Sequence, residues 1–209
     1  MSERKLRKYY DQSPDANLGE QHHPLNTILF YGLSFSAIIF LSLLFVFLVW
    51  VENKADDVTI HLSKAFVVSP YLLLCSLFSS TYFVRSYRED NNMQLLLSLA
   101  VALITGVIFG VLQVYGCLSV FENNPLIEFN TGTIILFVAT GFHLLFMLTG
   151  LLYLFYLTLK SYDNWNDPIK SLVYFSNQYE VKRLELASFY WYFTCISWTV
   201  LFFTFYSLS

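Results

Sequence analysis

The side chains best suited to chemistry in this chain are its histidines, and only one of them lies in an apolar run. The sequence has four histidines in 209 residues. His143 stands in the stretch FVATGFHLLFMLTG, His22 and His23 lie in a polar N-terminal segment, and His61 precedes an apolar run. A membrane cytochrome commonly holds each haem between paired histidines. We therefore expect no haem, metal or other cofactor to be held by this chain.

His143 has two interpretations, as a ligand or proton relay, or as a neutral imidazole that hydrogen-bonds across a helix contact. Small residues favour the second, because Ala139, Gly141 and Gly150 lie close to His143 along the same run. Small residues let transmembrane helices approach closely, and a polar side chain there can bond across the contact. We predict a packing role for His143, Gly141 and Gly150.

The three cysteines are dispersed, one to each of three apolar runs. Cys75, Cys117 and Cys195 show no C-x-x-C or Cys/His spacing. Such a pattern favours neither a disulfide framework nor a zinc site. We expect small, buried packing residues at these positions.

The composition is that of a membrane protein. Hydrophobic residues make up 56% of the chain, aromatic residues 19% and charged residues 13%. A helix needs about 20 apolar residues to cross a bilayer, and backbone groups in lipid must bond internally. We predict an all-α fold with a polar tail over residues 1–24 and a transmembrane domain over 25–209. Its five spans are about 25–51, 62–84, 93–121, 131–159 and 186–208, with a kink at Pro70.

Lysine and arginine are unevenly divided between the two sides of the predicted bundle. Ten of the twelve fall in the tail and in the second and fourth loops, and only Lys54 and Lys64 fall on the other side. Cytoplasmic loops carry an excess of these residues. The pattern predicts a cytoplasmic N-terminus and an external C-terminus. The fourth loop is the longest, and the aromatic residues of its segment IKSLVYFSNQYEVKRL predict a short interfacial helix there.

Two further groups of residues indicate helix packing. Gly106 and Gly110 are one turn apart, and Gln113 follows on about the same face. Gly-x-x-x-Gly is a helix-packing motif, and an unpaired Gln is costly in lipid, so Gln113 should face protein. Trp191 and Trp198 are seven residues apart and share a helix face, as a buried contact or an interfacial belt.

Charged residues are missing from the interiors of the predicted spans. The runs 25–51, 93–121, 131–159 and 186–209 contain no Asp, Glu, Lys or Arg. Intramembrane charges usually mark ion or proton paths. A small independent transporter or channel therefore stays only as an alternative, and the lack of a basic patch excludes nucleic acid as a partner.

Three stretches together resemble subunit III of the haem–copper oxidases, the family of cytochrome c oxidases and quinol oxidases. FVATGFHLLFMLTG is similar to the family's T-G-x-H pattern with a glycine seven residues after the histidine. GVIFGVLQ, residues 106–113, resembles its glycine-then-Leu-Gln signature, and FYWYFTCISWTVLF, residues 189–202, resembles its last helix. The order and spacing agree over about residues 65–209. Five spans are similar to the short bacterial form of the subunit.

The chain departs from the family pattern at several polar positions. Phe146 replaces the second histidine of H-x-x-H, Tyr192 replaces a histidine of the last helix, and Gly116 stands where a glutamate follows the Leu-Gln motif. The first span also lacks the family's glutamate. Roles tied to those carboxylates are therefore not carried over to this chain.

The resemblance implies a non-catalytic subunit of a bacterial respiratory cytochrome c oxidase in the inner membrane. Such a subunit stabilises catalytic subunit I, which holds the haem and copper, and supports proton uptake. Its expected partners are subunit I, the other oxidase subunits and structural phospholipids, with membership of a larger respiratory supercomplex left open. Subunit III of a quinol oxidase remains an alternative. The residues expected at helix or subunit contacts are Gly106, Gly110, Gln113, Gly141, His143, Gly150, Trp191 and Trp198.

Overall fold

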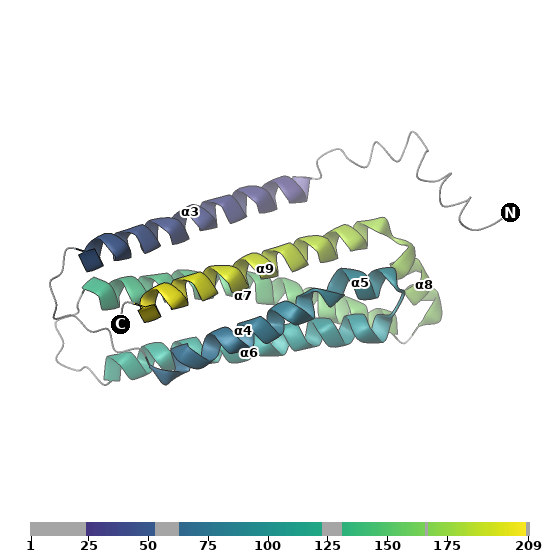
Figure 1. Cartoon of the computed structure of the whole chain (residues 1–209). Coiled ribbons are helices and arrows are strands. Elements are labelled where there is room, and N and C mark those ends of the chain that lie inside the picture. The colour runs from purple at the N-terminus through teal and green to yellow at the C-terminus, as the bar shows by residue number, and fades with distance from the viewer. Residues whose placement is uncertain (1–23, 53–62, 123–130, 166, 208–209) are drawn as a thin grey trace. The chain divides into compact units, whose positions relative to one another are not determined.

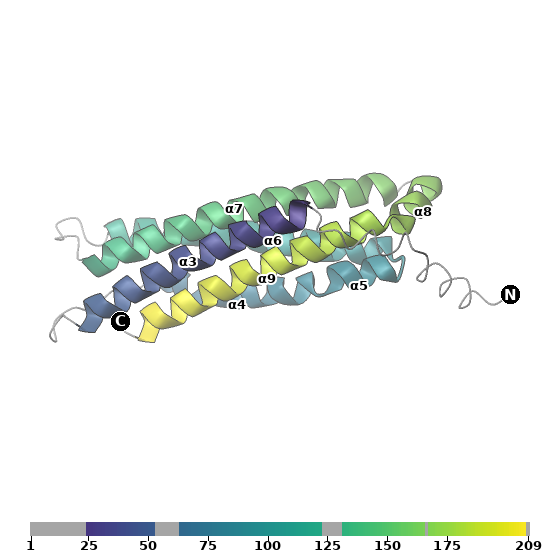
Figure 2. The same ribbon diagram turned by 90° about the horizontal axis from the view of Figure 1, so that it is seen from above.

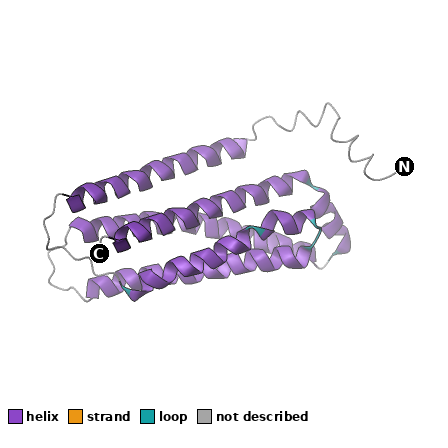
Figure 3. Ribbon diagram, viewed as in Figure 1, coloured by secondary structure: helices purple, strands orange, loops and turns teal. Residues whose placement is uncertain are grey.

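The computed structural model describes residues 24–52, 63–122, 131–165 and 167–207. Within these ranges every regular element is a helix, as Figure 3 shows. The chain divides into two compact units, Met1–Ser36 and Ala37–Ser209. The predicted polar tail lies outside the described residues, apart from Pro24.

In the part of the chain that the structure describes, five helical stretches are long and apolar enough to cross a membrane, which confirms the predicted number of spans. Their backbone groups bond within each helix, as a lipid environment requires. Four of the stretches lie in α3 (Pro24–Glu52), α6 (Asn92–Glu122), α7 (Thr131–Trp165) and α9 (Gln178–Ser207), and the other, Lys64–Arg88, begins with α4 (Lys64–Ser80) and includes the short helix after it. Two short helices complete the described chain, α5 (Tyr82–Arg88) and α8 (Pro168–Ser176).

Two of the helices extend well beyond the predicted spans. The apolar run ends near residue 159, but α7 continues to Trp165, and α9 begins at Gln178 instead of residue 186. The 35 residues of α7 correspond to roughly 50 Å of helix, against about 30 Å of hydrocarbon. Hydropathy marks only the apolar part, whereas helical hydrogen bonding continues through the polar turns outside it.

Helix α4 continues through Pro70, where a kink was predicted, and the second span is interrupted further along the chain. Helix α4 runs through Pro70 to Ser80, and a turn at Thr81 separates it from α5. Proline removes the hydrogen bond to the carbonyl four residues earlier, which is that of Phe66. The hydroxyl of Ser69 donates to this same oxygen at 2.8 Å. A neighbouring side chain thus replaces the missing donor.

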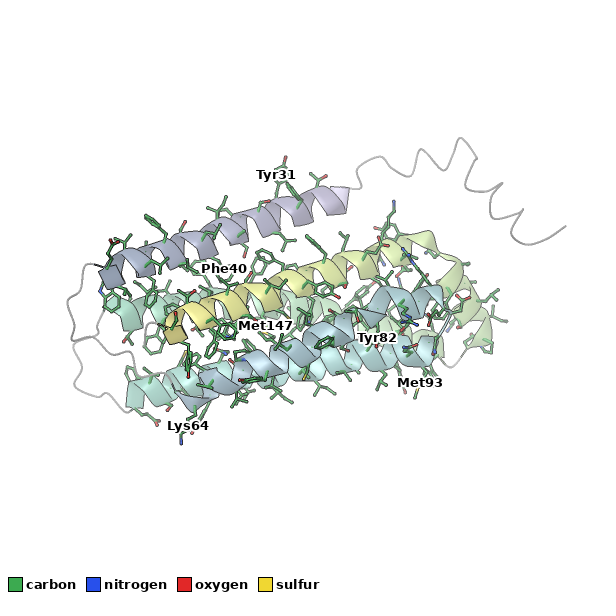
Figure 4. The ribbon with its side chains drawn as sticks, viewed as in Figure 1. Tyr31, Phe40, Lys64, Tyr82, Met93 and Met147 are labelled. Atoms are coloured by element: carbon green, nitrogen blue, oxygen red, sulfur yellow. The ribbon has the colours of Figure 1, made fainter. Side chains whose placement is uncertain are left out.

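The second unit is built around a ring of four helices (Figures 1 and 2). Helix α4 packs on α6, α6 on α7, α7 on α9, and α9 on α4. Figure 4 shows Met147 of α7 on the inner side, with Lys64 and Met93 on the outside. The largest fully buried side chains are aromatic, among them Trp191, Trp198, Phe66 and Phe109. The core is therefore a layer of rings between four closely packed helices.

The outer faces of the spans are apolar. Leu97, Val111 and Leu145 are each more than half exposed. Several hydroxyl groups on these faces bond within their own helix, as Ser42 does to the carbonyl of Ile38 at 2.8 Å. Such a bond removes much of the cost of a polar group in lipid. The outside of the bundle thus suits lipid or an apolar partner surface.

The fourth loop contains the predicted short helix, now placed at α8. Asp167 caps its first turn by accepting from the amides of Ile169 and Lys170 at 2.9 and 3.3 Å. Pro168 stands in the first turn, where its missing N–H costs nothing. The rest of the predicted segment, from Gln178, belongs to α9.

Candidate functional site

Two tryptophans of α9 hydrogen-bond to two serines of α4 in the centre of the bundle. The indole nitrogen of Trp191 donates to Ser76 Oγ at 2.7 Å, and that of Trp198 donates to Ser69 Oγ at 3.3 Å. All four side chains are buried. Both pairs of residues are seven apart, and the crossed order shows that α9 runs antiparallel to α4. A buried indole N–H usually needs such a partner.

The hydroxyl of each serine in turn donates a hydrogen bond to a backbone carbonyl. Ser69 Oγ donates to the carbonyl of Phe66 in α4, beside Pro70. Ser76 Oγ donates to the carbonyl of Ala102 in α6 at 3.4 Å. Ser76 therefore connects three helices, with Trp191 on one side and α6 on the other. Polar bonds of this kind between transmembrane helices contribute about 1 kcal/mol each.

Three glycines allow the aromatic rings to pack close to the helix backbones. A Cβ atom added at Gly106 would lie 2.7 Å from Leu151 Cδ2 and 2.9 Å from Trp191 Cη2. One added at Gly150 would lie 2.8 Å from Tyr190 Cε1, and one at Gly116 would lie 2.9 Å from Phe66 Cε2. Any larger residue would push these rings away.

The other two candidate glycines lie elsewhere. A Cβ at Gly110 or at Gly141 would meet nothing within 4 Å. Gly106 and Gln113 are both buried on the inner stripe of α6, seven residues apart, while Gly110 is turned aside. The close helix contact therefore lies at Gly106. Gly110 and Gly141 stay predictions as residues that contact another subunit.

His143 lies inside a cage of aromatic rings. Its ring centroid is 4.9 Å from that of Trp198, 5.6 Å from Phe109 and 5.9 Å from Phe40. Figure 4 shows Phe40 on the inner side of α3. The cage brings residues of α3, α6, α7 and α9 together at one level of the bundle.

Within the described ranges, His143 does not form the hydrogen bond across helices that we expected of it. Among the described residues neither ring nitrogen of His143 has a hydrogen-bond partner, although the side chain is fully buried. Its ring neighbours are aromatic carbon surfaces, so the imidazole packs as a flat ring. Gln113 is buried as predicted, but its amide also has no hydrogen-bond partner in the described part of the chain.

A second polar group, missed by the sequence analysis, lies where α7, α8 and α9 meet. Glu180 is 3% exposed, and its Oε1 accepts from Lys160 Nζ at 2.8 Å and from Arg183 Nη1 at 3.1 Å. A carboxylate is buried at reasonable cost only when it is paired in this way. The three-residue spacing of Glu180 and Arg183 on one helix could have predicted their ion pair from the sequence. The contact of Glu180 with Lys160 of α7 could not be predicted in this way.

The same end of the bundle holds α8 through tyrosines. The hydroxyl of Tyr87 shares its proton between the backbone carbonyls of Tyr174 and Asn177. The Tyr87 and Tyr174 rings pack edge to face with centroids 5.2 Å apart. Burial, and then the negative charge of Glu180, raises the pKa of the Tyr174 hydroxyl. This hydroxyl therefore stays protonated at physiological pH.

The remaining candidate residues divide by burial and by whether they are described. The thiol of Cys195 is buried, as expected, but Cys75 is exposed and Cys117 half-buried, and all three are free. The expectation that Cys75 is buried was wrong, because this residue lies on the outer face of α4. His22, His23 and His61 lie outside the described residues. Within the described ranges no three His, Cys, Asp or Glu side chains form a metal-binding group.

The arrangement as a whole is suited to holding helices together. The Trp191–Ser76 and Trp198–Ser69 pairs bond between helices, and the described part of the core presents packed rings around its histidine. Comparisons of the chain with protein-family profiles and with curated proteins find no match.

Proposed function

We propose that this chain is a non-catalytic, helix-packing subunit of a respiratory haem–copper oxidase, of the subunit III type. One observation carries the proposal: the three stretches that resemble that family meet in one core. The ring centroids of His143 in the first stretch and Trp198 in the third are 4.9 Å apart. Gly106 of the second stretch lies beneath the ring of Trp191. The residues that resemble the family thus pack together in one core.

The proposed role is to stabilise a catalytic partner that holds the haem and copper. The apolar outer faces of the spans support it, since they offer a large surface to lipid and to neighbouring helices. We further propose that the complex lies in a bacterial inner membrane. In that complex the chain would support proton uptake from beside the catalytic subunit.

The proposed orientation places the N-terminus in the cytoplasm. It is supported by the arrangement of the described cations, because Arg88 of α5 pairs with Glu185 of α9 at 2.9 Å and Lys160 pairs with Glu180. These cations share one end of the bundle, and cytoplasmic ends are rich in lysine and arginine. Labelling single introduced cysteines with a membrane-impermeant reagent tests the orientation.

The proposed function is tested by purifying the tagged chain from its native membranes in a mild detergent. We expect an oxidase with haem absorbance to co-purify, and the electron donor that it accepts would separate cytochrome c oxidase from quinol oxidase. Purification of the chain with no haem protein would contradict the proposal. Solute flux through liposomes that contain the chain alone would favour an independent transporter.

A variant in the core refines the test. Replacing His143 with Leu should weaken retention of this chain in the complex, because the aromatic cage loses its flat central ring. The haem content per catalytic subunit should stay unchanged. Loss of haem from an intact complex that still contains the variant would instead indicate a ligand role.

A further inference from the structure

The short helix α8 exposes three large apolar side chains along one face. Ile169 is 77% exposed, Leu172 75% and Val173 63%. Their spacing is i, i+3 and i+4, so they lie side by side on the helix surface, and we call them the apolar triad. Large apolar side chains that are exposed together usually mark a contact surface. The triad is therefore a candidate docking surface at this end of the chain.

The opposite side of α8 is fixed to the bundle. Tyr174 is buried, and the ring centroids of Tyr174 and Phe175 lie 5.2 and 5.0 Å from that of Tyr87 in α5. At about 3.6 residues per turn, these two rings project from the side of α8 that is turned away from the apolar triad. Figures 1 and 2 show α8 at the end of the ring of four helices, beside the ends of α7 and α9. The triad thus points away from the bundle.

The level of α8 along the bundle places the triad outside the apolar layer of a membrane. Exposed charges are costly in hydrocarbon, so the exposed pair of Arg88 and Glu185 lies at or beyond the edge of that layer. Helix α9 begins seven residues before Glu185, at Gln178, which corresponds to roughly 10 Å of helix. The headgroup layer on each side is about 5–8 Å thick. Because α8 precedes Gln178, its outward face meets water and not acyl chains.

The charges of α8 also do not favour a lipid surface. Helices that lie on membranes are typically rich in Lys and Arg on their polar face. The only cation of α8 is Lys170, whose Nζ lies 4.0 Å from Asp167 Oδ2. The charge of Lys170 is thus offset beside the triad, and attraction to anionic headgroups is weak. An uncharged, apolar protein surface complements this face better.

We propose that the apolar triad is a docking site for a partner protein that lies outside the membrane, at the end of the bundle rich in lysine and arginine. Apolar anchors at i, i+3 and i+4 fit a hydrophobic groove that accepts one face of a helix, so the partner should present such a groove. The contact buries the three side chains together. The inference goes beyond the proposed function, which haem absorbance tests, whereas the water accessibility of α8 tests the docking site.

Hydroxyl-radical footprinting with mass spectrometry tests the proposal, because it measures the water accessibility of individual side chains. The full chain is oxidised alone in phosphatidylcholine nanodiscs, and in the complex that purifies with it from native membranes. Oxidation of Ile169 and Leu172 should be about threefold or more lower in the complex than in the nanodiscs, since a protein interface excludes water from its core. Leu145, an exposed residue near the middle of α7, is the control for protection by lipid.

Two results of the footprinting would overturn the proposal. Protection of Ile169 and Leu172 in the nanodiscs, to the level of Leu145, would assign the triad to lipid. Equal oxidation of the triad in the nanodiscs and in the purified material would show a face without a partner, and this includes a chain that purifies alone.

A charge placed on the triad provides a second test. Leu172→Glu should leave the thermal midpoint of the full chain in detergent unchanged, because this side chain is exposed. In the purified complex it should raise the oxidation of Ile169 to the nanodisc level, together with the loss of one protein. Lys170→Glu is the matched control on the neighbouring face, where an exposed ion pair contributes little, and Ile169 should stay protected. Protection of Ile169 in the Leu172→Glu variant, or its exposure in both variants, would contradict docking through the apolar triad.

Discussion

The indole nitrogen of Trp191 lies 2.7 Å from the hydroxyl oxygen of Ser76, and both side chains are buried between α9 and α4. The hydroxyl in turn reaches the carbonyl of Ala102 in α6. One serine therefore joins three helices. Its replacement is the most direct test of how the core is held.

Replacing Ser76 with Ala should lower the free energy of unfolding by about 1–3 kcal/mol, because the buried indole N–H loses its acceptor. Denaturant or thermal unfolding in detergent measures the change. Ser42→Ala is the control, since Ser42 is exposed and bonds only within α3. In a Trp191→Phe background, Ser76→Ala should lower the free energy of unfolding by less than it does in the unaltered chain. Equal losses with and without the indole would contradict the assigned bond.

Two of the three glycines of α6, Gly106 and Gly110, should respond oppositely to one added methyl group. At Gly106 the new Cβ would lie 2.7 Å from Leu151 Cδ2, so Gly106→Ala should destabilise the bundle by about 1–3 kcal/mol. At Gly110 it would meet nothing within 4 Å, so Gly110→Ala should be neutral or stabilise by up to about 1 kcal/mol. The comparison uses thermal unfolding of the isolated chain. Equal effects would show that the inner stripe of α6 is wrongly placed.

The two glutamates near the start of α9 should differ in importance. Glu180→Gln removes a buried charge from Lys160 and Arg183, and we expect a loss of about 2–3 kcal/mol, below the 3–5 kcal/mol typical of fully buried pairs. Both cations are about a quarter exposed and can turn to water. Glu185→Gln affects only an exposed pair with Arg88 and should cost less than about 1 kcal/mol. Unfolding of the two variants under the same conditions measures both losses. A larger loss of unfolding free energy for Glu185→Gln than for Glu180→Gln would contradict the assignment of Glu180 as the buried, paired carboxylate.

His143 should tolerate another flat ring but not its removal. Because its neighbours are the rings of Trp198, Phe109 and Phe40, His143→Phe should change stability by less than about 1.5 kcal/mol. His143→Ala leaves a cavity and should cost about 2–4 kcal/mol. Thermal unfolding of both variants measures the difference. If the phenylalanine variant is as unstable as the alanine variant, the imidazole nitrogens form bonds that the aromatic cage does not explain.

The number and helical nature of the spans could be predicted from the sequence alone. A run of more than 20 apolar residues in lipid must bond its backbone internally, which leaves a helix as the solution for a single run. The ends of the spans were less certain. Helix α9 begins eight residues before its predicted span, because polar turns such as that of Glu180 extend a helix without adding hydropathy.

The inward face of each span became known only from the packed bundle. Transmembrane helices are apolar on nearly every side, so their sequence pattern does not distinguish a lipid-facing stripe from a buried one. Gly106 and Gly110 look equivalent in the sequence, but only Gly106 lies beneath Trp191.

The partners of the polar groups likewise required the tertiary structure. Ser76 and Trp191 are 115 residues apart in the chain, and Lys160 and Glu180 belong to different helices. Such pairs depend on the register between helices, which is set by how side chains interlock in three dimensions. The local sequence determines the length and polarity of each span, whereas the fit between helix surfaces determines which residues pair across the bundle.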